Sequence, residues 1–135
     1  DFDAHDGLWE MAVKTAHDPL VRMALVPRVL EARGLDVTPG IMQRLQRAGD
    51  SSAVEVLEII LRDEIGHVEI GTRWFRHLCA QRGLEPEATF AGLLQRYMKG
   101  QVKQPFHYQA RQQAGFNDIE MEMLEKLASG RYSSS

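Results

Sequence analysis

Residues 54–79 read VEVLEIILRDEIGHVEIGTRWFRHLC, and this stretch decides the fold of the chain. Apolar or small residues recur in it at alternating intervals of three and four, which predicts one long amphipathic helix: Leu57, Leu61, Val68, Gly71, Phe75 and Leu78. Glu64 falls inside this stripe and is expected to face the core. His67 lies one turn further on, so its imidazole and the Glu64 carboxylate can be directed at one object.

A metal ion is the most economical identity for that object. A carboxylate in a protein core is unfavourable unless it is paired or binds a cation. Glu-x-x-His on a core-facing helix is the spacing that ferritin-like di-iron or di-manganese bundles use on two of their four helices. Asp63 could accept a hydrogen bond from a ligating imidazole and fix its orientation. A solvated Glu–His pair is the alternative, but the charged residues gather on the other face: Glu55, Glu58, Arg62, Glu69, Arg73 and Arg76.

Glu31 poses the same question on an earlier helix. It continues the row of Leu20, Ala24 and Pro27 at helical spacing, so it too is expected to face inward. An ion pair with Arg22 or Arg28 is the alternative interpretation. Two inward carboxylates on separate helices, one of them a turn from a histidine, favour a shared metal site over two unrelated ion pairs.

Composition indicates an ordinary globular chain. It has 135 residues, 44% hydrophobic and 26% charged, with a net charge of -3, and it lacks a basic patch that would indicate nucleic acid binding. No apolar run approaches the roughly 20 residues that cross a bilayer, and no signal peptide is visible. The single cysteine, Cys79, excludes an internal disulfide, so we expect a cytoplasmic protein with a buried structural thiol.

Helices are expected throughout, and no strand pattern competes with the helical period. We predict helices over residues 7–16 and 19–34, the second with a kink at Pro27, and then a crossover at 35–50 that contains a short helix opened by Pro39. A long helix is expected from a Ser52–Glu55 capping box to Gly83. Three further helices are expected: one opened by Pro86, one around 107–114 and one capped by Asn117. Residues 1–83 form the metal-binding part of a helical bundle, and residues 84–135 form a C-terminal helical extension with a disordered tail.

Three stretches resemble a known family: RMALVPRVLEARGLDVTPG at 22–40, LEIILRDEIGHVEIGTRWFRHLC at 57–79 and AGF at 114–116. They are similar to bacterial ferritin-like proteins catalogued as a domain of unknown function, and in motif to tRNA-modifying di-iron hydroxylases. The resemblance implies that Glu31 is the carboxylate of the third bundle helix and that Glu64 and His67 belong to the fourth. It gives Asp63 the role of hydrogen-bond partner to the histidine.

The chain departs from the resembled family because the first two bundle helices have no counterpart in it. It supplies three of the six protein ligands of a complete dinuclear iron or manganese site. Two chains could pair as a homodimer and complete the ligand set, or a missing N-terminal segment could supply the rest. An incomplete site that binds no metal is the remaining outcome.

Three classes of function follow. The first is an oxidase or oxygenase that hydroxylates an unknown small molecule with O2. The second is iron or manganese binding or storage without an organic substrate. The third is a non-catalytic helical interaction domain whose inward carboxylates pair with arginines.

Overall fold

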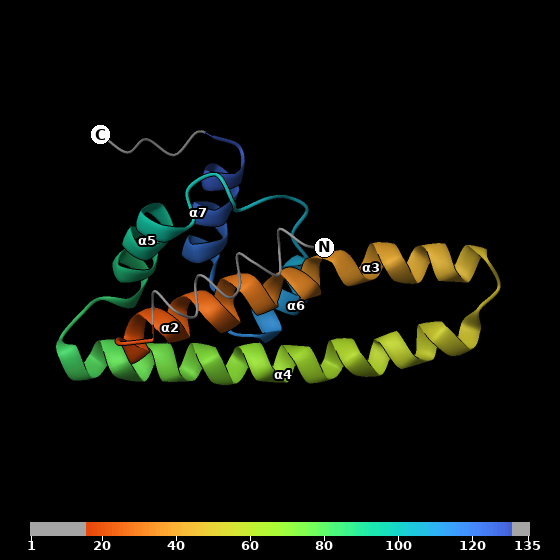
Figure 1. Cartoon of the computed structure of the whole chain (residues 1–135), viewed down its shortest axis with the longest axis horizontal. Helices are drawn as coiled ribbons and strands as arrows, with labels where there is room; N and C mark the ends of the chain where they lie inside the picture. Colours follow the sequence, from red (N-terminus) through yellow and green to blue (C-terminus); the bar gives the residue numbers. More distant parts are fainter. Residues whose placement is uncertain (1–15, 131–135) are drawn as a thin grey trace.

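The computed structural model describes residues 16–130, and all regular structure within them is helical (Figure 1). The elements are α2 (Pro19–Leu25), the π-helix η1 (Val26–Glu31), α3 (Ala32–Arg47), α4 (Ser51–Arg82), α5 (Pro86–Tyr97), α6 (Tyr108–Gln113) and α7 (Asp118–Ala128). The all-helical prediction is confirmed. The helix expected over 7–16 and the tail after residue 130 lie outside the described residues. None of the described helices has the length and apolarity that a bilayer span requires.

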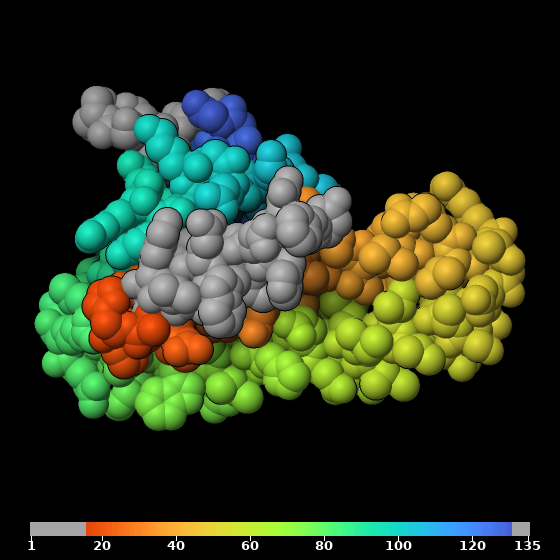
Figure 2. All heavy atoms as spheres, in the orientation of Figure 1, coloured from red at the N-terminus to blue at the C-terminus, as the bar shows by residue number. Residues whose placement is uncertain are grey.

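Two long antiparallel rods form the frame of the molecule. In Figure 1, α4 runs along the full length, and α2, η1 and α3 follow one another along it in the opposite direction. Helices α5 and α7 pack at the end where α2 begins, and α6 lies beside the middle of the rods. At the other end the hairpin of α3 and α4 extends by itself, and Figure 2 shows it as a separate lobe.

The chain passes from α2 into α3 through a π-helix rather than a kink. Asp18 caps α2, since its carboxylate accepts the Leu20 N–H at 3.0 Å. Pro27 has no N–H to donate, and its ring crowds the carbonyl four residues earlier. Its own carbonyl accepts the N–H of Ala32, five residues on, which is the wider π turn. The wider turn changes the direction in which residues at its end point, and Glu31 is the last of them.

The predicted crossover at residues 35–50 is wrong. Helix α3 continues through Gly34 and Pro39 to Arg47, and a short loop leads directly into α4. Gly34 costs about 1 kcal/mol relative to alanine, and Pro39 removes one backbone hydrogen bond. Packing against α4 outweighs both, because Ala32 and Leu35 are fully buried. The predicted short helix at Pro39 is therefore part of one continuous rod.

Helix α4 has the predicted end and a different start. Gly83 follows its last turn with φ 67°, the left-handed conformation that glycine adopts without strain. At the other end the carboxylate of Asp50 accepts the Ala53 N–H at 3.1 Å, so Asp50 is the cap instead of Ser52. Cys79 is buried, as expected, and burial raises the pKa of its thiol.

A buried arginine fastens the C-terminal helices to the rods. Arg28 is fully buried, and its guanidinium donates two 2.8 Å hydrogen bonds to the Glu120 carboxylate of α7. Its Nε donates to the Thr72 hydroxyl of α4 at 3.0 Å. Three aromatic rings surround the guanidinium at 4.4–5.4 Å from its Cζ: Phe75, Phe90 and Phe116. This one side chain thus joins η1, α4, α5 and α7.

A second buried ion pair secures α6 against α3. The Asp36 carboxylate accepts from Arg111 Nε at 2.9 Å and from Arg111 Nη2 at 2.6 Å, and it also accepts the His107 N–H at 2.8 Å. Beside it, Arg33 donates to the carbonyls of Lys103 and Pro105 at 2.6 and 3.0 Å. The loop before α6 is therefore held on α3 by charge-assisted hydrogen bonds.

Candidate metal site

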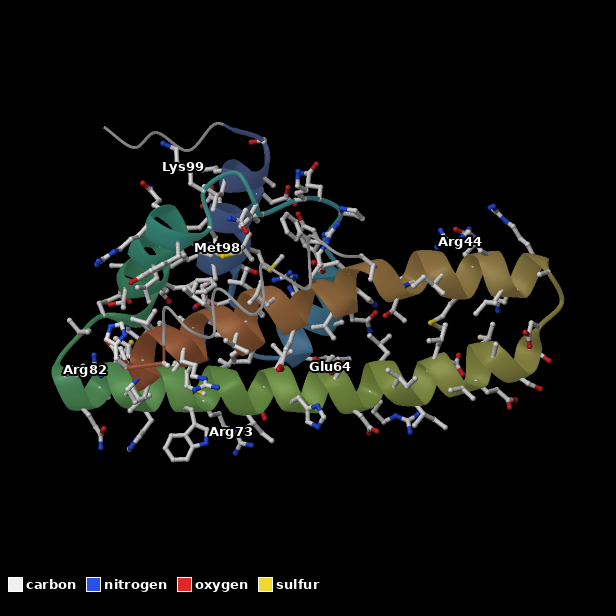
Figure 3. All side chains as sticks on the ribbon, viewed as in Figure 1. Arg44, Glu64, Arg73, Arg82, Met98 and Lys99 are labelled. Atoms are coloured by element: carbon white, nitrogen blue, oxygen red, sulfur yellow. The ribbon has the colours of Figure 1, made fainter. Side chains whose placement is uncertain are left out.

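Glu31 and Glu64 belong to two elements that pack directly on each other, η1 and α4. Glu31 is the last residue of the π-helix, and its side chain is exposed. Glu64 lies in the middle of α4, and Figure 3 shows it on the side of that helix turned toward the other rod, with Arg73 on the opposite side. The Glu64 side chain is 28% exposed, so it is directed at the other rod without being fully buried.

Glu64 and His67 form the local pair that their spacing predicts. The Oε1 of Glu64 is 3.7 Å from the Nδ1 of His67. The His67 side chain is 67% exposed, so it stands at the rim of the packed interior and is open to any group that packs on this side of α4. The imidazole is accessible to an additional ligand.

The two carboxylates influence each other electrostatically. Loss of hydration at the helix surface raises the pKa of Glu31, the Glu64 carboxylate raises it further, and His67 acts in the opposite direction. Among the described residues no arginine or lysine forms an ion pair with Glu31. Arg28, the alternative partner on the same turn, is committed to Glu120. Glu31 therefore lies within electrostatic reach of Glu64 and His67, and no arginine or lysine among the described residues pairs with either carboxylate.

These residues fit a partial metal site rather than a complete one. Carboxylate oxygens and imidazole nitrogen are the donors that iron and manganese take in carboxylate sites. Within residues 16–130, however, no three His, Cys, Asp or Glu side chains are gathered closely enough to hold a metal ion. The three predicted ligands, Glu31, Glu64 and His67, have the donor types of such sites and are half of the six protein ligands that a complete dinuclear site needs.

Asp63 is exposed on the outer side of α4. In the described part of the chain it makes no hydrogen bond to His67, whose near partner is Glu64. The role predicted for Asp63, orienting a ligating imidazole, needs a side-chain arrangement that differs from the one seen here.

Sequence reasoning missed the two carboxylates that are buried. Asp36 is 5% exposed and Glu120 is fully buried, and each is neutralised by an arginine. The signal was present, because Arg28 continues the stripe of Val21 and Leu25 at helical spacing just as Glu64 interrupts the stripe of α4. An arginine inside an apolar stripe predicts a buried acidic partner.

Two glycines flank the candidate site and differ in their surroundings. A Cβ at Gly71 would lie 2.4 Å from Cγ of Pro27, so this glycine lets η1 approach α4 closely. A Cβ at Gly66 would meet nothing within 4 Å. Packing within the described residues explains Gly71 and gives no reason for Gly66.

A surface hollow of about 450 Å³ lies between α3, α4 and the start of α6. Met42, Leu61 and His107 contribute to its lining, and Leu61 is one turn from Glu64 on the same helix. The volume is in the range of small-molecule pockets. The hollow therefore lies beside the part of α4 that carries the candidate ligands.

The chain is similar to proteins whose activity is not described. The model of a family described as a protein of unknown function, DUF455, matches residues 1–122. An uncharacterized protein of Haemophilus influenzae is 52% identical over 127 residues, which cover 94% of this chain and 44% of that relative. The chain thus spans less than half the length of the relative. No solved structure matches it.

Proposed function

We propose that this chain, which belongs to the DUF455 family, is a ferritin-like carboxylate protein that binds iron or manganese in the cytoplasm, with Glu31, Glu64 and His67 as its share of a dinuclear site. The observation that supports the proposal is the electrostatic influence of Glu64 and His67 of α4 on Glu31 of η1, with no arginine or lysine among the described residues paired with either carboxylate. A bound cation would remove the repulsion between the carboxylates and would recruit the exposed imidazole.

The distribution of arginines supports this assignment. Asp36 and Glu120 show how the fold neutralises acids that have a structural role, since each is held by a buried arginine through two hydrogen bonds. Glu31 and Glu64 are left outside that scheme although Arg28 lies only three residues from Glu31. Asp36 and Glu120 are thus structural carboxylates paired with arginine, whereas Glu31 and Glu64 remain available to a cation.

The remaining ligands have to come from outside the described residues. A second copy of the chain is one source. The other is a further region of a longer protein, since the match covers only 44% of the relative's length. Either source would have to pack on the side of α4 where His67 is exposed.

The chemistry we propose is oxidation of a small molecule by O2, in line with the resemblance to tRNA-modifying di-iron hydroxylases. A dinuclear iron centre supplies the activation of O2. The residues of the chain would hold the centre by two carboxylates and one imidazole, and Asp63 would orient that imidazole through its second nitrogen. The hollow beside Leu61 and His107 has a suitable volume for the substrate.

Metal titration of the purified chain tests the binding part of the proposal. After removal of metal with EDTA, Mn(II) or anaerobic Fe(II) is added and the heat of binding is measured. We expect Glu64→Ala to abolish binding and Glu58→Ala, on the outer face of the same helix, to leave it unchanged. Asp63→Asn should weaken binding about 10–100-fold, as loss of an orienting partner does. If Glu64→Ala binds metal as well as the parent chain, the proposal is wrong.

Aerobic turnover separates oxidation of a substrate from storage of metal. The iron-loaded chain is supplied with a reductant and O2 together with a small-molecule extract, and products are analysed by mass spectrometry. We expect an organic product heavier by one oxygen atom that is absent with Glu64→Ala. Oxidation of iron alone, without such a product, would favour the storage function.

A further inference from the structure

An apolar stripe runs along the outer side of α4. Its members are about half exposed although each is large and hydrophobic, and helical spacing puts them on one face: Val56, Ile59, Ile60, Ile70 and Trp74, with exposed fractions of 45–54%. In Figure 1 no described element covers the lower edge of α4, along which Figure 3 shows Arg73. The stripe consists of two apolar groups, and helical spacing puts the exposed Asp63 and His67 on the same face between them. Exposed apolar surface of this extent on a helix marks a contact with another protein surface.

Gly66 lies beside this stripe at the middle of α4. A glycine inside a helix costs about 1 kcal/mol relative to alanine, so its presence calls for a reason. Gly71 has one in the contact with Pro27, whereas a Cβ at Gly66 would meet open space. Absence of a side chain at the midpoint of an exposed apolar face permits close approach of a second helix at that point.

The charges of α4 are divided between its two halves. Residues 51–66 carry four carboxylates and one arginine, and residues 67–82 carry three arginines and one carboxylate. A second α4 running antiparallel would set the acidic half of one helix beside the basic half of the other. A parallel arrangement would instead place like charges together. The charge distribution therefore favours antiparallel over parallel pairing of two α4 helices.

We propose that α4 pairs with α4 of a second copy of this chain, antiparallel about a two-fold axis, with the helices crossing at Gly66 and His67. In this arrangement Trp74 of one chain packs against Ile59 and Ile60 of its partner, because positions equally far from the crossing lie opposite one another. The surface is self-complementary in apolar character and in charge, which a two-fold interface requires.

The area available is sufficient for a specific contact. Helix α4 has 32 residues. At about 1.5 Å per residue and a width of about 10 Å, the paired strip buries on the order of 500 Å² on each chain. The total of about 1,000 Å² is at the lower limit for specific protein interfaces. Contacts of the flanking rods would add to it.

The pairing is independent of the proposed metal site. Figure 3 shows Glu64 on the side of α4 turned toward the other rod, whereas the apolar stripe lies on the outer side. The partner chain therefore contacts α4 without approaching Glu31 on η1, and pairing depends on the apolar stripe and not on metal.

Oligomeric mass and site-directed cross-linking test the pairing in metal-free buffer with EDTA. Light scattering after size exclusion should give twice the mass of one chain. Ile59→Asp should raise the dissociation constant on the order of a hundredfold, because symmetry places the change twice in one interface. Circular dichroism confirms that this variant of an exposed residue keeps its helix content.

Cysteine cross-linking then locates the crossing point. Gly66→Cys should form a disulfide-linked dimer on mild oxidation, and Arg62→Cys, also exposed but four residues from the crossing point, should not. A monomer at all concentrations, or a dimer in which Arg62→Cys cross-links instead of Gly66→Cys, would overturn the proposal. Because no metal is present, failure of pairing is distinct from failure of metal binding.

Discussion

Arg28 and Glu31 lie within one turn of the same π-helix but have different environments. The Arg28 side chain is fully buried and its charge is used by Glu120. Glu31, at the end of the turn, has a pKa that is raised by loss of hydration and by repulsion from the carboxylate of Glu64. An i,i+3 pair of Arg28 with Glu31 would be favourable on a helix, yet the structure pairs Arg28 with Glu120 instead.

Replacing Glu31 by glutamine should therefore make the metal-free chain more stable. The raised pKa of Glu31 means that its charged form is disfavoured in the folded state. That cost is present above the folded-state pKa and is relieved as the pH falls through it. We expect Glu31→Gln to unfold at higher urea concentration than the parent at pH 7, with a smaller difference at pH 4.

Urea unfolding followed by circular dichroism in EDTA measures this effect, and Glu58→Gln is the control on the outer face of α4. Metal binding by Glu31→Gln should be lost in the same preparation. A variant that is less stable at pH 7 would mean that Glu31 has a structural role.

The two glycines of α4 should respond to alanine with opposite signs. Gly71→Ala places a methyl group against the rigid ring of Pro27 and should cost about 1–3 kcal/mol in unfolding free energy. Gly66→Ala meets no atom within 4 Å and should stabilise the monomeric chain by about 0.5–1 kcal/mol. Denaturant unfolding at low protein concentration measures both, and equal effects of the two changes would refute this reading of the packing.

At the scale of elements, the start, the end or the type of most helices followed from local sequence. Gly83 and Asn117 lie at helix boundaries in the structure as predicted, because capping depends on a few neighbouring residues. The path through Gly34 and Pro39 was predicted wrongly because long-range packing against α4 decides it. Helix-breaking residues such as Gly34 and Pro39 do not indicate how much apolar surface a continuous helix buries against its neighbour.

Helix α7 is held by a buried ion pair, and losing one partner should be severe. Glu120→Ala leaves the Arg28 guanidinium buried without its carboxylate, a change that typically costs about 3–5 kcal/mol. Glu122→Ala, two residues away, removes an exposed carboxylate and should change stability by less than about 0.5 kcal/mol. Thermal and urea unfolding compare the two variants. Similar stability of both would show that α7 is anchored by apolar contacts alone.

At the scale of the whole molecule, sequence could place Glu64 and His67 on one side of a helix but could not choose their partners. Their proximity follows from helical spacing alone. Which carboxylates are neutralised by arginine depends on contacts between residues as distant as Arg28 and Glu120, and these emerge only from tertiary packing. The outward stripe of α4 likewise became visible only when no described element covered it.

Elemental analysis of the size-separated chain tests the account most directly. The chain is loaded with Mn(II), freed of excess metal and passed over a sizing column connected to an elemental mass spectrometer. We predict metal in the peak of the paired chain at one ion per chain, and a metal-free peak of the same size for Glu64→Ala. Metal-free parent protein at every mass, or metal retained by Glu64→Ala, would contradict the account.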